Sequence, residues 1–174
     1  PTKSEINKLD SALSKEMKHI RETLKRVRDT EAAEKTWDLE IEMAALAETL
    51  SAYWNIEVVL CENVQTLAVT TTSMFNLQQF LREAVSNAVR HGRAALVTVD
   101  FSSDGGYLRF VVTDNGSGFR EEPAKTYPKS LQERIAGLGG TIDVQSLPGG
   151  TRLEVLIDVQ RLTTPSILPS GDTG

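Results

Sequence analysis

The sequence predicts an α+β protein. We expect a two-layer α/β sandwich in which helices cover one face of a mixed, mostly antiparallel sheet, plus an N-terminal coiled-coil-like helix. Hydrophobic residues make up 40% and charged residues 25% of the 174 residues, which is typical of a soluble globular chain. Helix-like and strand-like apolar patterns both occur, but they do not alternate strictly along the chain. This order favours segregated helices over a doubly wound parallel sheet.

Residues 1–35 are expected to form a dimerisation helix. Their apolar side chains are spaced three or four residues apart and form one seam: Ile6, Leu9, Leu13, Met17, Ile20, Leu24 and Val27. A stripe this narrow needs a partner helix to become buried, so we expect a homodimer formed through a helical bundle. A long terminal helix lying on its own domain is the alternative.

Residues 36–160 are expected to form the main domain. Period-two patterns within it predict strands at 56–60, 67–70, 95–101, 107–113, 141–145 and 151–159. The third and fourth strands are expected to form a hairpin around residues 102–106, and the last two around residues 148–150. Residues 161–174, rich in Pro, Gly and small polar residues, are expected to be a disordered tail.

Three helices are expected in the main domain. Residues 39–54 and 74–91 both carry apolar side chains at helical spacing, and the second pattern is the clearest in the chain. Residues 128–138 begin with a proline, which suits a first helical turn. Ser130 and Glu133 have the spacing of a capping box at the start of this helix.

Charge and composition exclude several kinds of protein. The net charge of -5 and the pI near 5.1 disfavour non-specific binding of nucleic acid. No apolar run reaches the roughly 18 residues that a membrane helix needs, so we expect no membrane contact by this chain. The single cysteine, Cys61, excludes an internal disulfide and a multi-cysteine zinc site. A reducing, cytoplasmic location is therefore expected.

Glu83, Asn87 and His91 follow one another at single-turn intervals along one side of the helix expected at 74–91. A carboxylate and an amide oxygen at the rim of a cavity suit Mg²⁺, which prefers oxygen ligands. For these residues taken alone, an ordinary solvated helix face is the alternative.

Residues 112–119 read Val-Thr-Asp-Asn-Gly-Ser-Gly-Phe and place an acid and two glycines at the end of an apolar strand. Asp114 can accept a hydrogen bond from a base amino group, while Gly116 and Gly118 permit close approach of a ligand. No Gly-Lys-Ser/Thr follows, so the loop is not a Walker A motif. The glycine pair before Thr151, taken alone, is an ordinary hairpin turn.

In this order and at these distances, the segments resemble the Bergerat-type ATP-binding domain of the GHKL superfamily, shared by sensor histidine kinases and DNA gyrase. Residues 81–91 resemble its N box and residues 112–119 its G1 box. Three further segments are most similar to nitrate-sensor-like histidine kinases: Ser-Leu-Gln-Glu-Arg-Ile at 130–135, Leu-Gly-Gly-Thr at 138–141 and Gly-Gly-Thr at 149–151. The N-terminal seam then resembles part of the dimerisation helix of a longer kinase.

The resemblance implies ATP and Mg²⁺ as ligands. It implies that Asn87 ligates Mg²⁺ bridging the phosphates and that Glu83, a second catalytic residue, orients or polarises a nearby water. His91 would add positive charge near the phosphates, although a solvated helix end explains this residue equally well.

The resemblance also implies an adenine site. Asp114 would bind the adenine amino group, and Thr151 would support this site, through water. Gly116 and Gly118 would let the backbone pass close to the nucleotide.

The implied function is phosphoryl transfer from ATP to a histidine on a dimerisation helix, and from there to a response regulator. Two departures from the family pattern bear on it. Too little chain separates His19 from the kinase-like domain, so we expect this chain to lack the phosphoacceptor. Residues 126–129, Thr-Tyr-Pro-Lys, replace a glycine-rich lid with a stiffer segment. A nucleotide-free interaction module and an anti-sigma-type serine kinase are therefore the alternatives.

Overall fold

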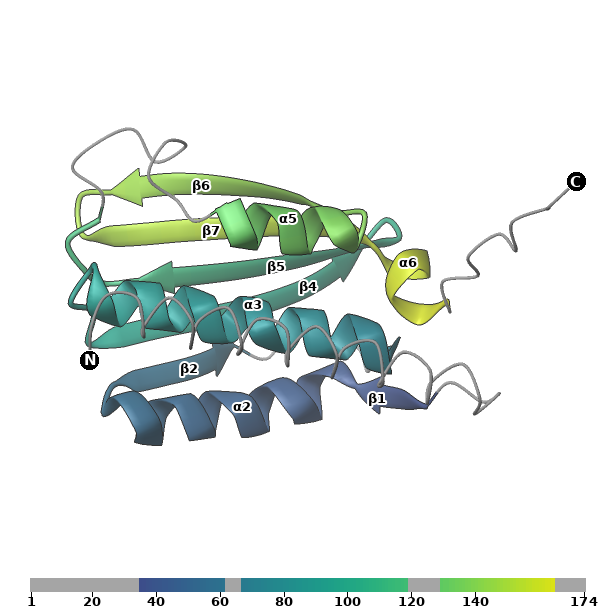
Figure 1. Cartoon of the computed structure of the whole chain (residues 1–174), viewed down its shortest axis with the longest axis horizontal. Helices are drawn as coiled ribbons and strands as arrows, with labels where there is room; N and C mark the ends of the chain where they lie inside the picture. Colours follow the sequence, from purple (N-terminus) through teal and green to yellow (C-terminus); the bar gives the residue numbers. More distant parts are fainter. Residues whose placement is uncertain (1–34, 62–66, 119–128, 165–174) are drawn as a thin grey trace, which may run out of the picture. The chain divides into compact units, whose positions relative to one another are not determined.

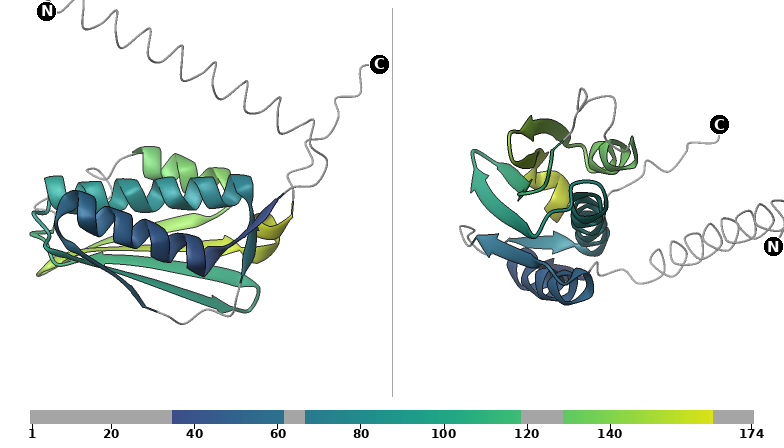
Figure 2. Two further views of the ribbon diagram at one scale, coloured as in Figure 1. Left: turned by 90° about the horizontal axis from the view of Figure 1, so that it is seen from below. Right: turned by 90° about the vertical axis from the view of Figure 1, so that its left-hand side faces the viewer.

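A computed structural model of the chain describes residues 35–61, 67–118 and 129–164. These residues form a two-layer α+β domain, which confirms the predicted fold class (Figure 1). Three helices lie side by side on one face of a five-stranded sheet (Figure 2). These three helices are α2 (Leu39–Trp54), α3 (Thr71–Arg90) and α5 (Lys129–Gly137). A fourth, short helix, α6 (Val159–Thr163), lies near the C-terminal end of the described residues. The expected dimerisation helix, residues 126–128 of the lid and the end of the tail lie outside the described residues.

The strand order in the sheet is β2-β4-β5-β7-β6, and β2–β4 is the parallel pair. The strands are β2 (Glu57–Cys61), β4 (Leu96–Asp104), β5 (Tyr107–Asp114), β6 (Thr141–Leu147) and β7 (Gly150–Asp158). Both hairpin turns are two residues long, shorter than expected. Gly105 and Gly106 form the first turn with φ of 58° and 85°, a conformation that lets pairing continue up to the turn.

A second, two-stranded sheet joins β1 (Thr36–Asp38) to β3 (Ala68–Thr70). We did not expect β1, because three residues carry no readable alternation. The small sheet places two helix starts next to each other: the Asp38 side chain accepts from the N–H of Ile41, and Thr70 accepts from the N–H of Ser73. It therefore fixes where α2 and α3 begin.

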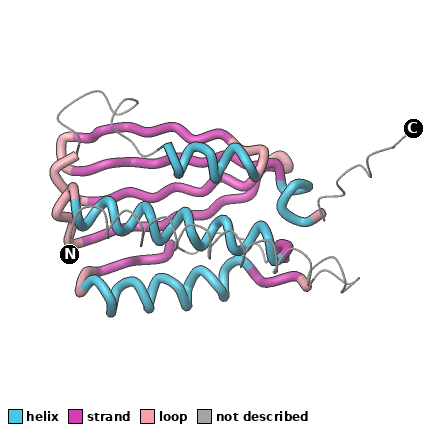
Figure 3. Tube along the Cα trace, in the orientation of Figure 1, coloured by secondary structure: helices cyan, strands magenta, loops and turns pink. Residues whose placement is uncertain are grey.

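The core lies between the sheet and the central helix α3. Phe80 of α3 meets Phe110 of β5 edge-on at 5.3 Å between ring centroids, and Phe101 lies 4.4 Å from Phe110. Leu162 of α6 is fully buried in the same core, and Figure 3 shows this helix following β7 at the end of the sheet. The described fold thus continues past residue 160, where we expected the domain to end. Leu162, at the start of a tail rich in Pro, Gly and small polar residues, gives no sign in the sequence that it is buried.

Leu162→Ala is expected to lower the free energy of unfolding by about 2–4 kcal/mol, because it removes a fully buried side chain and leaves a cavity. Urea denaturation of the full chain measures the change. Leu156→Ala is the matched control, since Leu156 is 42% exposed and should change stability by less than about 1 kcal/mol. Equally small effects of the two substitutions would show that α6 is not part of the folded domain.

Candidate functional site

The loop after β5 lies against the segment that follows α3. Ser117 donates its backbone N–H to the carbonyl of Gly92 at 2.8 Å. Asn115 Oδ1 accepts the N–H groups of both Ala95 and Leu96 at 2.9 Å. The two sequence segments predicted to share a site, the C-terminal end of α3 and the Asp-Asn-Gly loop, are therefore tied together by hydrogen bonds. The sequence predicts Gly92 only as the end of the helix at 74–91 and predicts no role in the site for Gly92 or Asn115, because their partners are distant in sequence.

Gly116 and Gly118 are required by packing within the protein itself. A Cβ on the buried Gly116 would lie 2.5 Å from the Gly92 oxygen and 2.9 Å from Asp114 Oδ1. Gly118 has φ of 66°, and a Cβ there would lie 2.8 Å from the Gly150 oxygen. The close approach of protein backbone already explains why both positions are glycine. Close approach of a ligand to them stays a prediction.

Asp114 is the half-buried acid of the site. Its Oδ1 accepts the N–H of Gly116 at 2.8 Å, and the backbone N–H and hydroxyl of the buried Thr151 also donate to the carboxylate. Burial raises the pKa of Asp114 above its ordinary value, while the hydrogen bonds from Gly116 and Thr151 act in the opposite direction. A carboxylate offers about four acceptor positions and three are used, so one remains for a donor from outside the protein.

Asn87 contributes an unsatisfied amide to the same end of α3. Its backbone oxygen accepts the N–H of His91 at 2.9 Å, and His91 is the exposed C-cap residue of the helix. The side-chain Nδ2 of Asn87 is buried and has no hydrogen-bond partner among the described residues. Because buried polar groups are nearly always paired, this atom points to a polar ligand at the site.

The residues present fit Mg²⁺ only if the nucleotide supplies further ligands. Asn87 and Glu83 offer an amide oxygen and a carboxylate on one side of α3, the hard oxygen ligands that Mg²⁺ prefers. Within the described ranges, no three His, Cys, Asp or Glu side chains come together as a metal site. Such a sparse set suits a magnesium ion held largely by phosphates and water.

Ser130 of α5, which the sequence predicts as a helix-capping residue, lies next to the site. Its hydroxyl donates to Glu83 Oε1 of α3. The expected capping box between Ser130 and Glu133 is therefore wrong: Glu133 instead pairs with Lys129 at 3.5 Å on the exposed side of the helix. Packing of α5 on α3 brings the Glu83 carboxylate within reach of the hydroxyl, and this tertiary partner replaces the local one.

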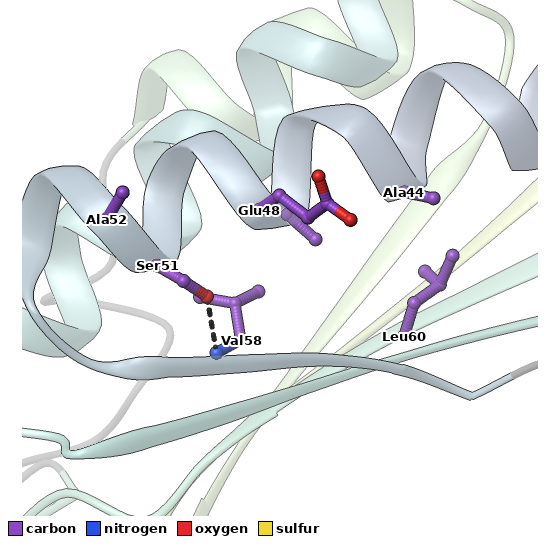
Figure 4. Close-up of a pocket in the computed structure, with 7 residues that line it drawn as sticks. Ala44, Glu48, Ser51, Ala52, Val58 and Leu60 are labelled. Carbon is purple, nitrogen blue, oxygen red and sulfur yellow. Dashed lines mark hydrogen bonds between the residues drawn. The ribbon is translucent and has the colours of Figure 1, made fainter.

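A separate groove lies between α2 and the edge strand β2, away from the predicted residues (Figure 4). Ser51 Oγ accepts the N–H of Val58 across it at 2.9 Å. Its lining is Ala44, Ala47, Glu48, Ser51, Ala52, Val58 and Leu60. No predicted site residue is among them, so the candidate site rests on Asp114, Thr151 and the end of α3.

Residues 74–161 match the family described as "Histidine kinase-, DNA gyrase B-, and HSP90-like ATPase". The match covers just over half of the chain and contains every predicted site residue. The chain belongs to this family.

Two curated relatives are sensor proteins by name, one of them a sensor histidine kinase. Sensor histidine kinase LiaS of Bacillus subtilis is 34% identical over 101 residues, covering 56% of this chain and 28% of LiaS. Sensor protein VraS of Staphylococcus haemolyticus is 37% identical over 90 residues, covering 49% of this chain and 26% of VraS. The chain thus spans about a quarter of the length of these relatives.

Solved structures of kinase domains share the fold. The ATP-binding domain of PrrB from Mycobacterium tuberculosis superposes with a TM-score of 0.61 at 25% identity, covering 76% of this chain and 98% of that domain. The histidine kinase domain of the blue-light-activated kinase of Erythrobacter litoralis EL346 gives 0.64 at 22% identity, covering 77% and 69%. The predicted ATP-binding domain of the sensor histidine kinase type is confirmed. In the described part of the chain, no helix is both long and apolar enough to cross a membrane.

Proposed function

We propose that this chain is the catalytic ATP-binding portion of a two-component sensor histidine kinase of the nitrate-sensor-like type. It binds Mg–ATP and donates the γ-phosphate to a histidine on a dimerisation helix. The observation that carries the proposal is the half-buried Asp114, held by Gly116 and Thr151 beside the end of α3 with one acceptor position left.

The Asp114 carboxylate binds the adenine amino group. Thr151 uses both its backbone N–H and its hydroxyl to hold this carboxylate, and Gly116 adds a third donor. With three donors fixing the acid, its orientation is set before a ligand arrives. Pre-ordering of this kind reduces the entropy lost on binding and favours one base over bases that present no amino group at that position.

The Asn87 end of α3 faces the phosphates. When bound, Mg²⁺ supplies charge neutralisation on the transferring phosphoryl group. Asn87 would offer its amide oxygen as the protein ligand of Mg²⁺, and Glu83, one turn earlier on the same side, orients or polarises a nearby water. His91, exposed at the helix end, adds a donor close to the phosphates. The buried Asn87 Nδ2 has no partner among the described residues and is a donor that a phosphate oxygen can accept from, so it supports placing the phosphates at this end of α3.

The partners follow from the family. The resemblance to sensor histidine kinases implies a homodimer and a response regulator as partners, and the relatives LiaS and VraS are named as a sensor histidine kinase and a sensor protein. We propose the same two partners for this chain, with residues 1–35 as the dimer contact and the cytoplasm as the location. Light scattering on the full chain and on Leu13→Asp with Leu24→Asp tests the dimer contact.

Asn87→Ala is expected to weaken ATP binding about 10–100-fold in the presence of Mg²⁺. The Asn87 side chain would contact charged groups, and a polar contact of this kind contributes about 1.5–3 kcal/mol to binding. With EDTA in place of Mg²⁺ the loss should be several-fold smaller. Isothermal titration with the full chain measures both.

Asn76→Ala is the matched control for this experiment. Asn76 lies on the same helix, but its Nδ2 donates to the Thr72 carbonyl one turn earlier, remote from the site. Its ATP affinity should be unchanged. The proposed function is contradicted if the unaltered chain shows no binding of Mg–ATP, and the role of Asn87 is contradicted if both variants bind equally well.

A further inference from the structure

The hydrogen bond between Ser130 and Glu83 joins two helices that are far apart in the sequence. The donor lies in the first turn of α5 and the acceptor in the middle of α3, 47 residues away. Neither side chain is deeply buried, so water could satisfy both. The hydrogen bond is therefore not required to satisfy buried polar groups, and its effect is to order the two side chains.

The position of Ser130 is set by the buried side of α5. Leu131 and Ile135 are fully buried and fix this helix against the core. Ser130 precedes Leu131 directly, so its hydroxyl cannot drift far from α3. Lys129 and Glu133 occupy the other, exposed face of the same turn and pair with each other. The Ser130 hydroxyl thus donates its hydrogen bond to Glu83 of α3 and not to a group of its own helix.

A free glutamate side chain samples many rotamers, and fixing one of them costs side-chain entropy. The Ser130 hydroxyl engages only Oε1, which sets the plane of the carboxylate and leaves Oε2 available. A carboxylate held in one orientation before the substrate arrives needs no reordering in the transition state.

We propose that Ser130 is a positioning residue that holds the Glu83 carboxylate in the orientation required during phosphoryl transfer. The inference rests on the proposed kinase function for its consequence, but the contact itself is a property of the nucleotide-free chain. Ser130 acts through Glu83 and lies on a different element from Asp114 and Thr151. Its loss should therefore reduce turnover and leave nucleotide affinity unchanged.

The first test is spectroscopic and needs no nucleotide. In the full chain carrying ¹³C-labelled glutamate, Ser130→Ala should shift the side-chain carboxyl resonance of Glu83, and Ser130→Thr should restore it because threonine keeps the hydroxyl. Lys129→Ala, which alters the exposed ion pair on the same turn, should leave it in place. A Glu83 resonance that is identical in all four proteins would overturn the contact.

The second test separates binding from turnover. Single-turnover transfer of the γ-phosphoryl group from Mg–ATP to a histidine on a dimerisation helix supplied in trans is expected to slow at least tenfold in Ser130→Ala, which raises the barrier by about 1.4 kcal/mol or more. In Ser130→Thr the rate should stay within about threefold of the unaltered chain. The Kd for Mg–ATP should change by less than about twofold in both. Unaltered turnover in Ser130→Ala, or an equal loss in Ser130→Thr, would overturn the positioning role. Failure of the unaltered chain to bind Mg–ATP would refute the kinase proposal, and the resonance test would still decide the contact.

Discussion

Asp114→Asn is expected to weaken ATP binding about 10–100-fold, because a hydrogen bond accepted by a charged group contributes about 1.5–3 kcal/mol. The substitution removes the charge and also turns part of the acceptor into a donor. Gly116 and Thr151 already direct donors at this side chain, so the new NH₂ group either faces one of them or takes the position left for adenine. Isothermal titration of the full chain with Mg–ATP measures the loss.

Asp104→Asn is the matched control for this substitution. Asp104 is exposed at the end of β4 beside the hairpin turn, and its replacement removes the same charge without touching the site. Its ATP affinity should stay within about twofold, since exposed charges interact weakly in water. Equal affinities of the two variants would show that Asp114 does not recognise the base. Absence of binding by the unaltered chain would favour the nucleotide-free interaction module.

The unaltered chain and Asp114→Asn together also test how ATP affinity depends on the protonation of Asp114. Burial raises its pKa above the ordinary value of 3.8, so the acid keeps its proton to higher pH in the fold than in the unfolded chain. ATP affinity should fall as the pH drops through this raised pKa, because the charged acceptor is lost. The difference between the unaltered chain and Asp114→Asn isolates this effect from titration of ATP itself.

The contribution of Asp114 to folding stability should depend on pH in the opposite direction to ATP affinity. Between the unfolded and folded pKa values of Asp114 the folded chain binds more protons, so its contribution to stability is greatest below 3.8 and declines as the pH rises through the folded pKa. Urea denaturation at a series of pH values from 3.8 upward should show the stability difference shifting in favour of Asp114→Asn until the pH exceeds the folded pKa of Asp114. A constant difference across this range would show that burial of the carboxylate carries no energetic penalty.

Elements with strong local signals were predictable from the sequence. The helix expected at 39–54 matches α2 at both ends, since apolar periodicity and a capping aspartate agree there. The other expected helices and strands of the main domain are present with ends shifted by three residues or fewer. The link between Asp114 and Thr151 was predictable only through the family resemblance, because either residue alone is an ordinary feature of a turn or strand.

Features that depend on distant partners were not predictable in this way. The three residues of β1 become a strand because they pair with β3, which lies about thirty residues later. Leu162 looks like part of a polar tail until α6 folds back onto the core. Ser130 had a plausible local partner three residues on, yet it bonds to Glu83 across the helix interface. In each case a tertiary contact determined the outcome, and local spacing carries no information about it.

A substitution at Gly150, at the start of β7, is the second change with a large expected effect. Its φ is 143°, a region that L side chains rarely adopt, and a Cβ there would overlap the backbone oxygen of Asp114. Backbone cannot move aside as a flexible side chain can. Gly150→Ala is therefore expected to lower the free energy of unfolding by about 3–5 kcal/mol, combining backbone strain with overpacking. Urea denaturation measures the change.

The preceding residue supplies the control. A Cβ on Gly149 would meet nothing within 4 Å, so Gly149→Ala should alter stability by less than about 1 kcal/mol. Because Thr151 follows Gly150 directly, any displacement that relieves the overlap also moves the two donors that hold Asp114. Folded Gly150→Ala protein should consequently bind ATP more weakly than Gly149→Ala protein. Equal stability of the two variants would mean that β7 does not approach Asp114 as closely as the structure places it, and the adenine site would then lack its support.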